Sequence, residues 1–402
     1  MPLYLGLDAG KHSLTALVIE IEGSTRRIVF NRVIAFDRDL AEPSPAPLPL
    51  RWAHALDRVM GRLAETAEID IERIRAISGA VDDHAEVEVP TAAAEQWRAL
   101  RPAGALAPQL TRVFEAPYSA VTTPVTASEY LTSLLAGIDD RHARDDEGRR
   151  LAGYWRKRYS FPGAMVVAST GVSQASVIGT GVFRDGMLGV SLGTTDTVFS
   201  HGSPLHFQNG SIAREWMRVE YRVDWDAIGF FLESMPGNGG AVMLPWVQAE
   251  TTPPVAHPGV RRFGFDRYDA ATNVRGLIEG QMMAMANHAT AMLEEPLERV
   301  IAIGSDARQR EVLQVMANVF GADVYRLDTA NVAALGTALR AYHADRLAFG
   351  EPVSWHSVIS GFTDPNAGHR VAPNPKHVAI YAALRQDYAI LEMLHQARPP
   401  IC

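Results

Sequence analysis

The chain has 402 residues, a length that favours two domains over one compact core. A net charge of −8, from 38 basic and 46 acidic residues, argues against a nucleic-acid-binding surface. No apolar run is long enough to span a membrane, and the N-terminus lacks a signal pattern. The only cysteine, Cys402, excludes a disulfide framework, a cysteine-rich zinc site and a cysteine nucleophile in a formed pocket. We therefore expect a cytoplasmic protein that binds neither nucleic acid nor membrane.

The first 40 residues are predicted to form consecutive strands. Apolar and β-branched residues gather at 3–7, 14–21 and 27–36, and short turns separate these segments. Such tight connections favour an antiparallel meander. The proline-crowded segment 41–50 is expected to be neither helix nor central strand. A helix with Trp52, Leu56 and Leu63 at helical spacing follows, and then a short buried strand at 74–78.

The rest of the chain repeats this order of elements. We expect a charged helix at 149–159, a strand at 165–168 and a second series of strands at 187–201. The C-terminal third predicts helices and intervening strands, namely helices at 274–293, 310–320, 332–345 and 378–396 and strands at 299–303 and 323–327. A strand meander followed by helices, given twice, indicates a duplicated α/β unit rather than a single Rossmann sheet.

The strongest chemical signal is the segment Gly189–Thr197, in which a strand enters a turn of Ser, Gly and Thr and leaves as a second strand. A turn of this kind directs backbone N–H groups and hydroxyls into one concavity that suits phosphate oxygens. The segment Gly6–Lys11 has a matching form, and its Asp8 could hold Mg²⁺ through water. Each turn taken alone is also ordinary hairpin chemistry.

A third motif lies at 300–307, where an apolar strand ends in Gly304, Ser305 and Asp306 and a helix begins. Glycine lets the backbone approach a base or ribose closely, and Ser305 or Asp306 is a candidate N-cap. A plain β–α turn is the alternative interpretation. Downstream of the second strand series, the helix that carries Met282, Met283, Met285 and Met292 is expected to belong to the core.

Residues 189–345 resemble the C-terminal half of xylulokinases and related FGGY carbohydrate kinases. The likeness is carried by short segments in the right order: SLGTTDT at 191–197, MPGNGG at 235–240, LIEGQ at 277–281, EVLQVMA at 311–317, DTAN at 328–331 and ALGTA at 334–338. In the N-terminal half, residues 6–8, 36–40 and 77–80 fit the same family. The resemblance implies an α/β fold of two actin-like ATPase (ribonuclease H-like) domains, 1–187 and 188–402, around an interdomain ATP cleft. The last helix is expected to pack back across this cleft.

The resemblance also implies a function. FGGY kinases transfer the γ-phosphate of ATP to a sugar hydroxyl, so Mg²⁺ and ATP are the expected cofactors. The implied nucleotide-binding residues are Asp8, Gly10, Lys11, Gly193, Thr194, Thr195, Gly304 and Ser305, and Asp8 would also organise the metal. Asp83 and His84 fall at the place of a sugar contact. The expected partners are a small-molecule sugar and a nucleotide, with a homodimer as one option.

The main departure from the family concerns the catalytic base. The family carries an aspartate after the strand at 165–168, whereas this chain reads Thr170-Gly171-Val172, so Val172 stands at that position. The family's Trp-x-Asp sugar motif has no equivalent at 116–123, where Val121 is the best match to its aspartate. Lys11 replaces a threonine of the first phosphate loop. The chain is also shorter than the family norm, mainly within 40–50 and 125–160.

Three functions follow from these departures as alternatives. Valine accepts no proton, and a general base typically contributes about 10²–10⁴ in rate, so weak, altered or lost kinase activity is expected. Positioning and charge stabilisation alone can still support some transfer, and Asp82 or Asp83 could supply a substitute carboxylate. The rivals are a non-catalytic pseudokinase that binds nucleotide or sugar and an enzyme repurposed to a different acceptor.

Overall fold

The computed structural model describes residues 1–40, 48–81, 86–87, 125–136, 149–183, 185–200, 204–327, 331–364 and 366–397. The chain divides into two compact units, Met1–Gly181 with Asn331–Asp364 and Val182–Ala330 with Pro365–Cys402. The expected domain boundary at 187 is close to the boundary between Gly181 and Val182. The expectation of a single boundary does not hold, because Asn331–Asp364 belongs to the first unit. Asp82, Asp83, His84 and Val121 lie outside the described residues.

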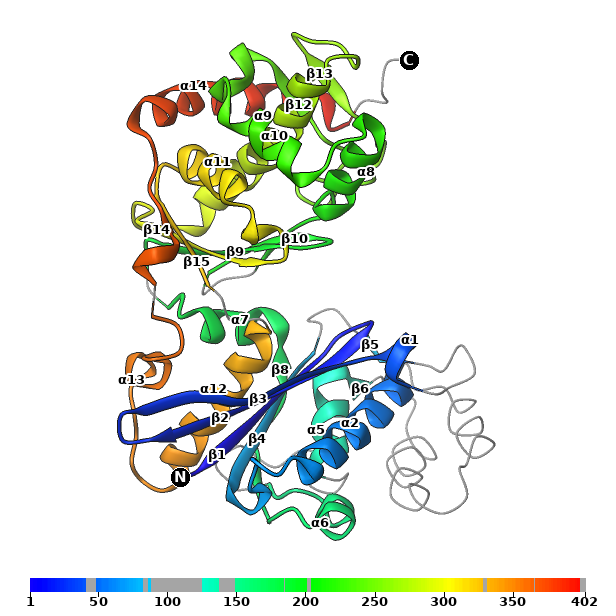
Figure 1. Cartoon of the computed structure of the whole chain (residues 1–402), viewed down its shortest axis with the longest axis vertical. Coiled ribbons are helices and arrows are strands. Elements are labelled where there is room, and N and C mark those ends of the chain that lie inside the picture. Colours follow the sequence, from blue (N-terminus) through cyan, green and yellow to red (C-terminus); the bar gives the residue numbers. More distant parts are fainter. Residues whose placement is uncertain are drawn as a thin grey trace. The chain divides into compact units, whose positions relative to one another are not determined.

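The sheet of the first unit begins with the expected antiparallel meander of β1 (Leu3–Ala9), β2 (Ser13–Glu22) and β3 (Thr25–Ala35). Two parallel strands follow, β4 (Ile74–Val81) and β7 (Met165–Val166), which give the order β3-β2-β1-β4-β7. The short strand β8 (Thr170–Gly171) also pairs with β4 (Figure 1). A separate small ladder joins β5 (Glu86–Val87) to β6 (Val125–Thr126).

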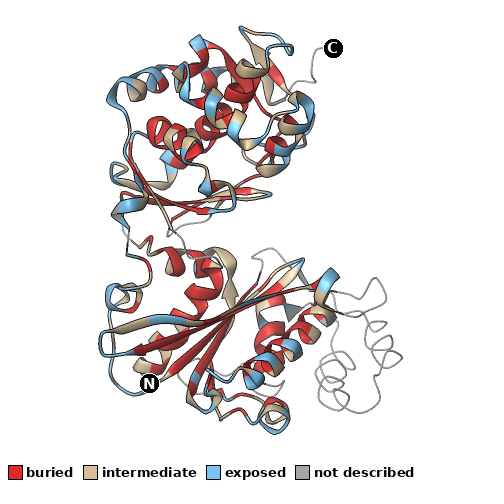
Figure 2. Cartoon of the chain, in the orientation of Figure 1, coloured by how far each residue is buried: buried red, intermediate tan, exposed pale blue. Residues whose placement is uncertain are grey.

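Helices cover both faces of this sheet, so its central strands are buried (Figure 2). One face packs against α2 (Leu48–Glu65), α5 (Ala127–Ala136) and α6 (Gly153–Tyr159). The other packs against α12 (Val332–Ala348), α7 (Val172–Thr180) and α13 (Trp355–Ile359). A Cβ atom on Gly6 of β1 would lie 2.0 Å from the carbonyl oxygen of Ala334, so glycine is what allows α12 to lie on β1.

Two local expectations for the first unit were wrong, and one helix was missed. Helix α2 begins at Leu48, inside the proline-rich segment, because a proline in the first turn of a helix costs no hydrogen bond. The charged helix is shorter than 149–159, since α6 begins at Gly153 and Arg150 forms a β-bridge with Met165. Helix α5 was not expected. It is buried on nearly every side, so it lacks the amphipathic pattern that reveals a surface helix.

The second unit repeats the topology of the first. Its meander consists of β9 (Met187–Leu192), β10 (Asp196–Phe199) and β11 (Leu205–Phe207), and its parallel strands are β14 (Arg299–Gly304) and β15 (Asp323–Arg326). The order β11-β10-β9-β14-β15 and the strand directions match those of the first sheet, and β16 (Arg370–Val371) adds an antiparallel edge. The prediction of a duplicated α/β unit is thus confirmed.

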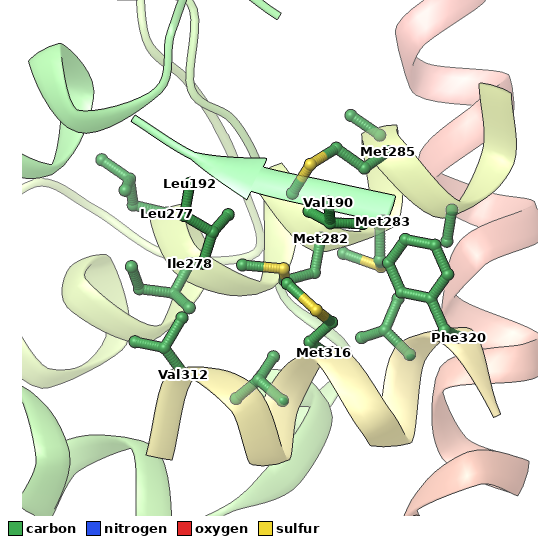
Figure 3. Close-up of a cluster of buried hydrophobic side chains, with 14 of the residues drawn as sticks. Val190, Leu192, Leu277, Ile278, Met282, Met283, Met285, Val312, Met316 and Phe320 are labelled. Carbon is green, nitrogen blue, oxygen red and sulfur yellow. The ribbon is translucent and has the colours of Figure 1, made fainter. Parts of the chain in front are cut away.

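The described residues of the second unit also form the α-helices α8 (Ser211–Tyr221), α9 (Trp225–Glu233), α10 (Ala270–Ala289), α11 (Arg310–Phe320) and α14 (Pro375–His395). A two-stranded ladder of β12 (Val242–Leu244) and β13 (Arg261–Phe263) lies beside α10. Figure 3 shows Met282, Met283 and Met285 of α10 among side chains of β9 and α11, as expected for core methionines.

Helix α14 belongs to the core of the second unit. Its side chains Tyr381, Leu384 and Tyr388 are buried in the same cluster as residues of α10 and α11. The expectation that the last helix packs across a cleft stays a prediction, since one face of α14 packs within its own unit while Ile390 and Met393 are exposed. Among the described helices, none is long and apolar enough to cross a membrane.

Candidate functional site

The turn between β9 and β10 carries Gly193, Thr194 and Thr195. The N–H of Gly193 donates to Asp196 Oδ1 at 3.1 Å, and the N–H of Ser211 donates to the carbonyl oxygen of Gly193 at 2.7 Å. A Cβ atom on Gly210 would lie 2.5 Å from that same oxygen. The turn is therefore held against the N-terminus of α8, and glycine at position 210 makes this close approach possible.

The hydroxyl-bearing residues of this turn differ in exposure. Thr195 is half-buried, and its Oγ1 donates to Gln208 Oε1 at 3.2 Å. Thr194 is exposed, and its hydroxyl has no hydrogen-bond partner in the described part of the chain. The turn thus presents a free hydroxyl on a fixed backbone, which is suitable for phosphate oxygens.

The loop after β14 lies beside this turn. Strands β9 and β14 are parallel, and Gly304 is paired with Leu192 in the register. Because the carboxyl ends of adjacent parallel strands meet at one edge of a sheet, Gly304 and Ser305 are next to the turn at 193–195, and both are exposed. All the predicted nucleotide residues of the second unit are thus brought together. Their role in binding stays a prediction.

Of the two N-cap candidates, Ser305 occupies the N-cap position and Asp306 does not. The helical segment after β14 starts as a short 3-10 turn, η5 (Asp306–Arg308), without a side-chain cap, and α11 begins only at Arg310. Asp306 instead accepts a hydrogen bond from Arg214 Nε at 2.6 Å. The carboxylate therefore pairs with a charged partner that is more strongly attractive than a backbone N–H.

Arg214 is the functional candidate that sequence reasoning missed. Its side chain on α8 is only 1% exposed and binds both oxygens of Asp196 at 2.8 Å. Burial raises the pKa of Asp196, and the guanidinium only partly offsets this effect. One signal was available: Arg214 is spaced i,i+3 from the buried Met217, so it falls on the core side of a helix.

Asp8 lies near the end of β1 and is half-buried. Burial raises the pKa of its carboxyl to about 6, and the carboxylate has no hydrogen-bond or ion-pair partner within the described ranges. The following turn is fixed, because the N–H of Gly10 donates to Ser13 at 2.9 Å and Trp52 Nε1 donates to the carbonyl oxygen of Gly10 at 2.8 Å. Lys11 is exposed next to Gly10.

Val172 begins helix α7, directly after β8. The register pairs Asp8 with Ala80 and Ala80 with Thr170, so the start of α7 is at the same sheet edge as Asp8. Val172 is partly buried against a small cluster of Ala80, Ala175 and Ala333, and the first turn of α7 contains no acidic residue. The position of the expected base is thus filled by an apolar contact.

The described residues contain no group of three or more His, Cys, Asp and Glu side chains that could hold a metal ion. Asp8 is therefore a lone candidate ligand on its strand. A single carboxylate fits Mg²⁺, which usually keeps several waters and binds through one or two carboxylates together with substrate phosphates.

Comparisons with known proteins show which family this chain resembles. Residues 232–344 match the FGGY family of carbohydrate kinases, C-terminal domain. The chain is 34% identical over 285 residues to xylulose kinase of Rattus norvegicus, a match that covers 62% of this chain and 52% of the relative. It is 24% identical to xylulose kinase 2 of Arabidopsis thaliana, over 85% of this chain and 87% of that protein. The chain thus spans about half the length of the rat relative it matches.

The fold comparison covers nearly the whole chain. The crystal structure of ligand-bound xylulose kinase from Lactobacillus acidophilus superposes with a TM-score of 0.76 at 15% sequence identity, over 98% of both chains. This likeness concerns the fold, which in these two-domain sugar kinases is that of actin-like ATPases. The chain thus resembles FGGY carbohydrate kinases, and xylulose kinases among them, in sequence and in fold.

Proposed function

We propose that the protein binds ATP or ADP through the loops at 193–195 and 304–305 and retains at most weak phosphoryl transfer to a ketose. One contrast carries the proposal. Thr194, Gly304 and Ser305 of the expected nucleotide loops are exposed, and they lie on backbone that neighbouring contacts hold in place. The residue at the place of the catalytic base is an apolar side chain packed against alanines.

The nucleotide half of the proposal depends on backbone and hydroxyl donors. Turns of this kind bind phosphate through N–H groups and hydroxyls. Since the N–H of Gly193 donates to Asp196, the proposed donors of this turn are Thr194 and Thr195. Ser305, where the family has a second glycine, narrows the adenosine side. We therefore expect a dissociation constant between micromolar and millimolar, roughly 4–8 kcal/mol of binding free energy.

Asp8, Gly10 and Lys11 are proposed to contribute to nucleotide binding from the first unit. The unpartnered Asp8 carboxylate, with its pKa of about 6, is mostly ionised at neutral pH and can bind Mg²⁺ or its waters. When bound, Mg²⁺ would neutralise phosphate charge. Lys11 offers an ammonium group in place of the family's threonine.

The catalytic half of the proposal follows from Val172. Loss of a general base removes typically 10²–10⁴ in rate, or roughly 3–5 kcal/mol of barrier lowering. A pseudokinase and an enzyme with a different acceptor remain the alternatives. Asp82 and Asp83 stay the proposed substitute carboxylates for residual transfer. They directly follow Val81, which pairs with Gly171 just before Val172. Asp83 and His84 stay the proposed sugar contacts.

The experiment that tests the proposal has two arms. Calorimetry measures binding of Mg-ATP and Mg-ADP, and a coupled assay measures ADP production with and without a panel of ketoses. We expect measurable nucleotide binding and turnover at least about 100-fold below that of ordinary kinases. Turnover of D-xylulose at about 1–100 s⁻¹ would contradict weak catalysis. If such turnover is lost in Asp82→Asn or Asp83→Asn, the substitute carboxylate is identified.

A further inference from the structure

Arg214 links the two loops that are proposed to bind nucleotide. We propose that it is a positioning residue that sets the relative placement of the 193–196 turn and the 304–306 loop, and so controls affinity for a nucleoside polyphosphate. The inference rests on the proposed nucleotide binding and adds to it a residue that does not itself touch the ligand.

Each N–H group of the guanidinium has an acceptor. Nη1 donates to Asp196 Oδ2 at 2.8 Å and to Gln281 Oε1 at 3.0 Å. Nη2 donates to Asp196 Oδ1 at 2.8 Å and to the carbonyl oxygen of Gly193 at 3.4 Å, and Nε donates to Asp306 Oδ2 at 2.6 Å. A planar fork with all its donors engaged has one orientation, so its acceptors are held in one arrangement.

The two carboxylates are parts of the loops themselves. Asp196 directly follows Thr195, and its Oδ1 also accepts the N–H of Gly193, which closes the turn. Asp306 directly follows Ser305, whose hydroxyl donates to Asp306 Oδ1 at 2.9 Å. A shift of Arg214 would therefore move the donors of the phosphate turn relative to those of the adenosine loop.

The burial of Arg214 separates positioning from direct binding. With 1% of its side chain exposed, the guanidinium cannot contact a ligand that meets the exposed Thr194 and Ser305. Net stability is also a weak explanation for the network, because buried ion pairs are often matched or surpassed by apolar side chains of similar volume. Apolar side chains in place of this network could match its stability, but they would not fix the position of one loop relative to the other.

The test compares the affinity of the protein for ADP with its affinities for adenosine and for pyrophosphate. Arg214→Lys keeps the positive charge but cannot make the two-pronged bond to Asp196 together with the bond to Asp306. We expect ligand-observed NMR titrations to show that the affinity for ADP falls at least about tenfold, while the affinities for adenosine and for pyrophosphate each change less than about threefold. Only ADP binds to both loops at once, so only its affinity depends on the relative placement of the two loops. Arg218→Lys is the matched control. Arg218 lies one turn after Arg214 on α8 and forms an ion pair with the exposed Glu215.

A second variant covers the case in which Arg214→Lys does not fold. Asp306→Ala removes one bond of the network and leaves the Asp196 pair in place, and it should show the same selective loss for ADP. Equal losses for all three ligands, or unchanged ADP affinity in a folded variant, would overturn the positioning role while nucleotide binding stands. Failure of the unmodified protein to bind ADP would overturn the proposed function and this inference together.

Discussion

Gly304 of β14 lies so close to Leu192 of β9 that a Cβ atom on it would be 2.2 Å from the Leu192 carbonyl oxygen. Gly304 also has a φ of +101°, in the region where side chains are strained. The contact joins the ends of the two strands from which the proposed nucleotide loops begin. Glycine is thus required at this position for two reasons: the backbone has a positive φ, and there is no room for a Cβ atom beside the Leu192 carbonyl.

Gly304→Ala is expected to damage both stability and nucleotide binding. Backbone strain alone costs about 1–3 kcal/mol, and the clash with Leu192 adds to it. Gly240→Ala is the matched control, because Gly240 has a φ of +90° and a Cβ atom on it would have nothing within 4 Å. Chemical denaturation of both variants should show the larger loss for Gly304→Ala. Equal losses would mean that the approach to Leu192 relaxes without cost.

Val172→Asp is expected to raise phosphoryl transfer without unfolding the protein. An acid in the first turn of α7 interacts favourably with the helix dipole, which offsets the loss of apolar contacts with Ala80, Ala175 and Ala333 to within about 1 kcal/mol. The new carboxylate can accept a proton, so ADP production with D-xylulose should rise at least about tenfold. The rate should stay below that of ordinary kinases, because the Trp-x-Asp sugar motif is also absent.

The control for that gain is Val172→Asn, which has the shape of the aspartate but cannot act as a base. It should have the activity of the unmodified protein. If both variants gain equally, polarity rather than proton transfer is responsible. If neither gains although nucleotide and sugar bind, the position does not reach the acceptor hydroxyl.

Much of the sheet architecture could be predicted because it depends on local signals. Tight turns between apolar segments fix an antiparallel meander, and such a meander was predicted in both halves. The return of Asn331–Asp364 to the first unit could not be foreseen, since the contact between Gly6 and Ala334 joins residues far apart in the chain. Helix α5 escaped prediction because its burial removes the polar face.

The candidate site likewise has parts that could be predicted from the sequence and parts that could not. The turn at 193–195 and the loop at 304–305 could be predicted because each is a short motif of glycine and hydroxyl residues. Their connection through Arg214 could not, because it joins three segments by side chains whose directions emerge only from packing. Asp306 was one of two N-cap candidates for the same reason, since local spacing does not reveal a distant guanidinium.

The raised pKa of Asp8 predicts a pH-dependent contribution to stability. Its carboxyl has a pKa of about 6 in the folded protein against 3.8 as the reference for the unfolded chain. The unfolded state therefore ionises first, and the free energy of unfolding contributed by Asp8 falls as pH rises from about 4 to 6, by at most about 3 kcal/mol. Denaturation at several pH values should show this fall in the unmodified protein and its absence in Asp8→Asn.

The comparison needs a control for removal of an acid elsewhere in the same unit. Asp37 is exposed on α1 (Phe36–Asp39), so Asp37→Asn should keep the fall between pH 4 and 6. A stability difference between the unmodified protein and Asp8→Asn that does not vary with pH would show that burial of the Asp8 carboxyl is not what disfavours its charged form.

Lys11→Thr should weaken nucleotide binding. Lys11 is exposed next to a turn that Gly10 and Trp52 hold in place, and under the proposed function its ammonium binds a phosphate of the nucleotide. Loss of one charge-assisted hydrogen bond at an exposed position should reduce Mg-ATP affinity about three- to tenfold, or roughly 0.6–1.4 kcal/mol. Because the interaction is ionic, the difference in affinity between the two proteins should shrink as the salt concentration is raised.

Lys157→Thr, a change of another exposed lysine on α6, should leave the affinity unaltered. Tighter binding by Lys11→Thr would show instead that the ammonium occupies the place of a phosphate group and that threonine, the family's residue, reopens it.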